Sequence, residues 1–91
     1  MLPGEDLVQK GLADLRRGIE SEEALLVSMG APRLRRLGYE IAKPFASPEH
    51  RLYGLLSRSD PAAAHSRYNA LVRRLVSFER AAESVAPHVD A

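Results

Sequence analysis

Residues 60–85, DPAAAHSRYNALVRRLVSFERAAESV, are the longest stretch of the sequence with an uninterrupted helical pattern. The side chain of Asp60 can accept hydrogen bonds from the free N–H groups at a helix start, and Pro61 has a preset φ and no donor to lose. Pro87 marks the end, because proline cannot continue a helix. The sequence therefore predicts one long helix over residues 60–85.

Apolar residues recur along this stretch at alternate spacings of four and three, which is typical of a helix that buries one side. They are Ala64, Tyr68, Leu71, Leu75, Phe78, Ala82 and Val85. Val72 and Val76 widen the apolar arc to roughly half of the circumference, which is too wide for one neighbouring helix. We therefore expect a core helix that is contacted from two sides and carries arginines on its outer face.

Four shorter helices are expected before it, each with a recognisable start or stop. They cover residues 5–17, ended by Gly18; residues 22–29, capped by Ser21 and closed by Gly30; residues 31–37, opened by Pro32 and stopped by Gly38; and residues 48–58, capped by Ser47. The first of them should bury Leu7, Val8, Leu12, Leu15 and Ile19.

Residues 39–46, YEIAKPFA, alternate poorly and contain Pro44, so they are expected to form an extended connection rather than a strand. Tyr39, Ile41 and Phe45 should hold it against the helices. The predicted fold is all-α, a compact bundle of four to five helices around one long C-terminal helix, with more than about 60% of the residues helical. We expect a single domain over residues 1–91, with a frayed tail at residues 87–91.

The connection between the last two helices is very short, which predicts an antiparallel αα-hairpin. If its turn is centred near Ser59, antiparallel packing should place His50 beside Tyr68 and Tyr53 beside His65. Such ring contacts would fix the register of the hairpin.

Composition excludes several classes of protein. The chain has 13 basic and 12 acidic residues, which is too balanced to indicate nucleic-acid binding from net charge, and it has no cysteine for disulfides or thiolate chemistry. No apolar run approaches the ~18 residues of a membrane span, and the N-terminus does not resemble a signal peptide. The expectation is a cytoplasmic protein without membrane attachment.

Few residues are candidates for metal or acid–base chemistry. His50, His65 and His88 match no zinc-binding spacing, so neither a metal site nor a cofactor is expected. Glu79 lies inside the apolar arc, one turn from Glu83. The sequence leaves several interpretations of Glu79 open. It is either an acid with a raised pKa or half of a metal site, or it has a structural role. In the structural case it pairs with an arginine from residues 33–36 or from another chain, or it lies at a helix end that is more solvated than the arc suggests.

Six arginines can be grouped into a basic face for phosphate groups: Arg33, Arg35, Arg36, Arg73, Arg74 and Arg80. Residues 22–38 have the order helix, tight turn, helix, as in a helix-turn-helix motif. However, the second helix is short, Arg36 takes an apolar place of that motif, and no aromatic residues are interleaved to stack bases. A solvated charged face is therefore favoured, with nucleic-acid binding as the alternative.

Arg58 and His65, written R-S-D-P-A-A-A-H, resemble the R-x(4–6)-H element of the HEPN ribonucleases, small helical bundles that place this pair at a dimer interface. The resemblance covers residues 58–65 only. It implies that Arg58 and His65 act on an RNA phosphodiester.

No glycine-rich phosphate loop, nucleophile elbow or Ser/His/Asp set can be assembled. The favoured function is a small non-enzymatic interaction or scaffolding domain that self-associates as a homodimer, because a chain of this length leaves much apolar surface in contact with water. The interface candidates are Tyr68, Val72, Val76 and Phe78. Nucleic-acid binding and a HEPN-like ribonuclease are the alternatives.

Overall fold

The chain forms five α-helices in a computed structural model, which describes residues 1–85. The helices are α1 (Glu5–Arg16), α2 (Glu22–Met29), α3 (Ala31–Arg36), α4 (Pro48–Ser59) and α5 (Ala64–Val85). Helices make up 71% of the described residues and no strand occurs among them, which confirms the predicted all-α fold with its longest helix at the C-terminal end. The predictions for Pro87, for His88 and for a frayed tail at residues 87–91 lie outside the described residues.

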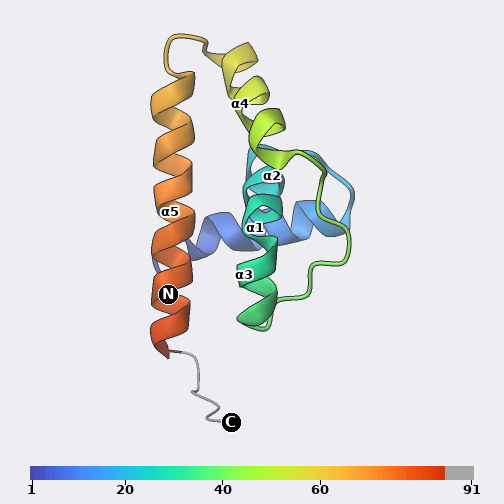
Figure 1. Cartoon of the computed structure of the whole chain (residues 1–91), viewed down its shortest axis with the longest axis vertical. Helices are drawn as coiled ribbons and strands as arrows, with labels where there is room; N and C mark the ends of the chain where they lie inside the picture. Colours follow the sequence, from blue (N-terminus) through green and yellow to red (C-terminus); the bar gives the residue numbers. More distant parts are fainter. Residues whose placement is uncertain (86–91) are drawn as a thin grey trace.

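Figure 1 shows α5 along one side of the molecule, with α4 antiparallel beside its N-terminal half and α1 crossing its C-terminal half. The helix with the highest buried fraction is α2, in which every residue from Ala24 to Ser28 is buried. The sequence pattern explains this position, because the ALLV run of α2 is apolar all round and such a helix is stable only inside a core. None of the helices in residues 1–85 has the length and apolar character to cross a bilayer.

The helices α1 and α2 cross at Gly11, where α1 has no side chain between its backbone and its neighbour. A Cβ atom at this position would lie 2.5 Å from Val27 Cγ2 and 2.9 Å from the carbonyl carbon of Glu23. Both separations are far inside normal van der Waals contact, so the two helices approach this closely only because residue 11 is glycine. The sequence pattern did not predict this contact.

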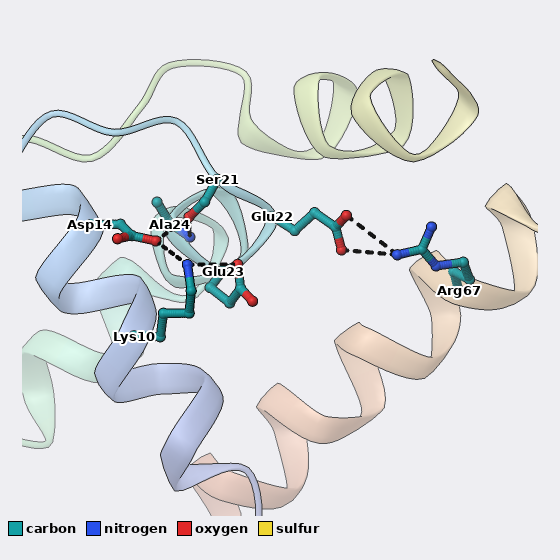
Figure 2. Close-up of polar contacts among 7 residues, drawn as sticks. All are labelled: Lys10, Asp14, Ser21, Glu22, Glu23, Ala24 and Arg67. Atoms are coloured by element: carbon teal, nitrogen blue, oxygen red, sulfur yellow. Dashed lines mark hydrogen bonds and ion pairs between the residues drawn. The ribbon is translucent and has the colours of Figure 1, made fainter. Parts of the chain in front are cut away.

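A polar network around Asp14 holds the loop between α1 and α2 (Figure 2). Ser21 Oγ accepts a hydrogen bond from the backbone N–H of Ala24 at 3.0 Å, which confirms Ser21 as the N-cap of α2. The same hydroxyl donates to Asp14 Oδ2 at 2.7 Å, and Lys10 Nζ lies 2.6 Å from that oxygen. The hydrogen bonds from Lys10 and Ser21, in that order of importance, hold the pKa of Asp14 below its usual value.

The start of the last helix differs from the prediction. We expected it at Asp60, but α5 begins at Ala64 and Asp60 is instead the C-cap residue that follows α4. The Asp60 carbonyl and Oδ1 both accept a hydrogen bond from the backbone N–H of Ala63, at 3.2 and 3.3 Å, and close a turn over residues 60–63. An aspartate that bonds a local backbone donor stabilises a turn as well as a helix start, and here the turn is favoured.

This longer connection shifts the register of the hairpin. The Tyr53 ring contacts the Tyr68 ring edge-on, with centroids 5.7 Å apart, whereas the predicted register paired Tyr68 with His50 and Tyr53 with His65. The antiparallel hairpin was predicted correctly, but its register was wrong because four residues rather than one form the turn.

Two other expectations fail locally. Ser47 was predicted to cap α4 with its side chain, but it adopts a left-handed conformation (φ 48°) and makes no such hydrogen bond. Ile19 was predicted to be a core residue, but it follows the end of α1 and is exposed.

The segment between α3 and α4 is an extended connection, as predicted. Ile41 is buried, the Tyr39 ring lies 5.8 Å from the Phe78 ring, and the backbone N–H of Phe45 donates to Ser28 Oγ at 3.0 Å. Tyr39 and Phe45 therefore hold this segment against α5 and α2, and Ile41 is part of the core.

Candidate functional site

The four interface candidates on α5 have different environments in the structure. Phe78 is fully buried within its own chain, against Tyr39, so its side chain is not available to a partner. Tyr68, Val72 and Val76 are half-buried. Successive residues of this set are four positions apart, so they form one row along the side of the helix.

Tyr53 extends this row onto α4. Its ring contacts Tyr68, yet 42% of the residue remains exposed to solvent. We call the set Tyr53, Tyr68, Val72 and Val76 the apolar strip. Tyr68 and Val72 still pack against the core of the chain, whereas Val76, one turn further along, is half-buried without belonging to that core. The strip therefore runs from the core outward to the molecular surface.

The outer face of α5, by contrast, is polar. It carries Ser66, Ala70, Arg73, Ser77, Arg80 and Ser84, all exposed. This pattern confines the half-buried apolar side chains to the flanks and the core side of the helix. A partner that buries apolar surface on α5 would therefore use the flank that carries Val76.

Glu79 borders the apolar strip and is a buried carboxylate with an arginine partner. Its Oε1 lies 3.5 Å from Arg33 Nη1, and Arg33 Nη2 also contacts Glu83 Oε2 at 2.5 Å. This ion pair with an arginine of residues 33–36 is one of the interpretations that the sequence left open. Burial raises the pKa of Glu79, Arg33 partly opposes the shift and Glu83 adds to it.

Replacing Glu79 with glutamine should change the pH dependence of stability. Because the pKa of Glu79 is raised above 4.5, the folded state binds its proton more tightly than the unfolded chain does. Ionisation of Glu79 therefore lowers stability as the pH rises above this value. In urea unfolding measured between about pH 4 and pH 7, the free energy of unfolding of E79Q should increase relative to that of wild type with rising pH.

Asp14 provides a control of opposite sign. Because the pKa of Asp14 is lowered, its ionised form stabilises the fold above pH 3.8, the ordinary pKa of an aspartate. This stability is lost as the pH falls through the pKa of Asp14 in the folded state. D14N should therefore be less stable than wild type at neutral pH and should approach wild type in acid. A difference between E79Q and wild type that stays constant with pH would contradict the assignment for Glu79.

The six arginines of the predicted basic face differ in their contacts. Arg33 binds the two carboxylates already described, Arg35 Nε donates to the carbonyl oxygen of Ile41 at 2.9 Å, and Arg74 Nη2 lies 3.1 Å from Asp6 Oδ1. These three connect elements of the fold. Arg36, Arg73 and Arg80 connect no elements of the fold and are exposed, and Arg73 Nε donates to the carbonyl oxygen of Asn69 on its own helix at 3.3 Å.

Arg58 and His65 are both exposed and lie on opposite sides of the turn that joins α4 to α5. Arg58 Nη1 lies 3.7 Å from where a Cβ of Gly54 would be, so its side chain folds back along α4. His65 Nε2 is 3.2 Å from Asn69 Nδ2 on its own helix. Each side chain thus contacts its own helix.

Arg67 and Arg74 each form an ion pair between helices that was not predicted from the sequence. Arg67 of α5 pairs with Glu22 of α2 at 3.2 Å (Figure 2), and Arg74 of α5 pairs with Asp6 of α1. The partners in these pairs lie 45 and 68 positions apart in the sequence, and no local sequence signal pairs residues over such separations. Within residues 1–85, no group of three or more His, Cys, Asp or Glu side chains is arranged to hold a metal ion.

Comparison with protein-family models, with curated proteins and with solved structures found no match.

Proposed function

We propose that this chain is a small non-enzymatic interaction domain that self-associates as a homodimer through the apolar strip. The observation that carries the proposal is Val76. It is a half-buried apolar residue outside the core of its own chain, in line with Val72 and Tyr68. Contact with a second apolar surface would remove this side chain from water and lower its free energy.

A second copy of the same strip is the simplest such surface. Two-fold symmetry brings identical patches together, and it is the commonest symmetry of soluble oligomers. With α5 antiparallel to its copy, the valines of one strip would face those of the other. The exposed charges of α5 would then form the rim, where they cost little because they remain hydrated.

Val76→Arg is the discriminating variant. A charged side chain at the centre of the proposed contact would have to be buried without a partner, which strongly opposes association. Light scattering coupled to size-exclusion chromatography should give two chain masses for wild type at micromolar concentration and one for V76R. Far-ultraviolet circular dichroism should show the same helix content in both proteins.

Ala70→Arg is the matched control, because Ala70 lies on the polar outer face of the same helix. This variant should remain dimeric. A single chain mass for wild type would refute the proposal, and loss of the dimer in both variants would show that the apolar strip is not the contact.

Nucleic-acid binding remains the second candidate, and the exposed residues Arg36, Arg73 and Arg80 are the observation that favours it. It ranks lower because four of the six arginines already bind acidic or carbonyl groups of the chain. Salt-dependent retention on heparin that R73E and R80E abolish would support it. RNA cleavage that is lost in H65A would support the ribonuclease alternative.

A further inference from the structure

A cleft of about 230 Å³ lies between the C-terminal part of α1 and the connection from α3 to α4. Figure 1 shows this connection passing the far end of α1, on the side of the molecule away from α5. Its lining residues are Leu12, Leu15, Arg16, Glu40, Ile41, Ala42 and Lys43. The cleft is therefore separate from the apolar strip.

The cleft combines an apolar wall with a cationic rim. Leu12 and Ile41 are buried core residues, and Leu15 packs against that core from the edge. Arg16 and Lys43 are exposed residues that line the same cleft. Within residues 1–85, neither of these two cations forms an ion pair with a carboxylate, in contrast to Arg33 and Arg74, which connect helices elsewhere in the fold.

The far wall of the cleft is held in place. Arg35 donates from Nε and from Nη2 to the carbonyl oxygen of Ile41, and the buried Ile41 side chain anchors the same residue. A ligand would therefore find this wall formed before it binds, which limits the loss of conformational entropy on binding. Through this bond to Ile41, Arg35 adds a third positive charge near the cleft, while Glu40 is the one carboxylate among the lining residues.

We propose that this cleft binds a small amphiphilic monocarboxylate, with its hydrocarbon chain along Leu12, Leu15 and Ile41 and its carboxylate between Arg16 and Lys43. The volume sets the size of the ligand. A cavity of about 150 Å³ holds the six carbons of benzene, so 230 Å³ corresponds to roughly nine or ten non-hydrogen atoms. Octanoate has that size, and its charge is opposite to that of the rim.

The experiment titrates octanoate into the ¹⁵N-labelled protein and follows the backbone amide signals by NMR. We expect the largest shifts at Ile41, Ala42 and Lys43, with a Kd on the order of 0.1–1 mM, as ligand efficiency allows for so small a molecule. Butanoate should bind more than about tenfold more weakly, because four fewer methylene groups are buried. Octylamine, with the same chain and the opposite charge, should bind at least about fivefold more weakly than octanoate.

Lys43→Glu tests the rim, and Lys43→Gln is a milder second variant should the charge reversal disturb the fold. We expect K43E to weaken octanoate binding by about five- to tenfold and to reduce the preference over octylamine. Arg80→Glu makes the same change of net charge on α5, away from the cleft, and should leave the affinity unchanged. The proposal is overturned if octanoate below about 10 mM causes no shifts, if octylamine binds equally well, or if the shifts map to α5.

Discussion

Replacing Gly11 with alanine is expected to lower the free energy of unfolding by about 2 kcal/mol, although alanine is the better helix former. The new Cβ would lie 2.5 Å from Val27 Cγ2 and would overlap the carbonyl group of Glu23, so α1 and α2 would have to move apart. Overpacking of this kind costs about 3 kcal/mol at the upper end of its usual range, while removing a helical glycine recovers about 1 kcal/mol. Urea unfolding followed by circular dichroism at 222 nm measures the difference.

Gly54→Ala is the matched control, because it makes the same change inside α4. The nearest atom to a Cβ at this position is Arg58 Nη1 at 3.7 Å, which is an ordinary contact with a flexible side chain. G54A should therefore gain about 0.5–1 kcal/mol from helix propensity alone. If G11A proved as stable as G54A, the crossing of α1 and α2 would have to be looser than the structure shows.

Much of the fold was predictable because local signals and burial agree. Ser21 precedes an acidic first turn and an apolar run, and the structure shows the cap hydrogen bond that this order implies. The predicted anchors Tyr39 and Ile41 contact the core because a connection without a partner strand can bury only its apolar side chains. The pattern did not predict the exposure of Ile19, since it lies beyond the end of α1.

The errors occur where two local structures compete for the same residues. Asp60-Pro61 is compatible with both a helix start and a turn, and the choice depends on how α4 and α5 pack. A turn of four residues rather than one then changes every side-chain neighbour along the hairpin. The contact between Tyr68 and Tyr53 belongs to this shifted register.

The candidate site was predictable only in part. A pattern of apolar residues identifies the side of α5 that is apolar, but it does not say which of those side chains the chain itself covers. Phe78 and Val76 are two residues apart and equally apolar in the pattern, yet one is fully buried and the other half-buried. The cleft beside Ile41 had no signal at all, because it depends on where residues 40–43 pass α1.

Replacing Phe78 with alanine is expected to be the most destabilising single change on α5. Phe78 is fully buried by its own chain, where it packs on Tyr39 and beside Gly4. Truncating a buried phenylalanine costs about 3–5 kcal/mol, which is a large share of the stability of a small domain. Urea unfolding at several protein concentrations should show this loss.

The dependence on concentration separates the two possible roles of Phe78. A core residue lowers the stability of each chain by the same amount at every concentration, whereas an interface residue acts only where the dimer is populated. Val76→Ala, on the same helix, should cost less than about 1 kcal/mol in dilute protein, because its side chain lies outside the core. A loss of stability in F78A that disappears on dilution would instead assign Phe78 to the dimer interface. The core of the chain would then have to be packed without its side chain.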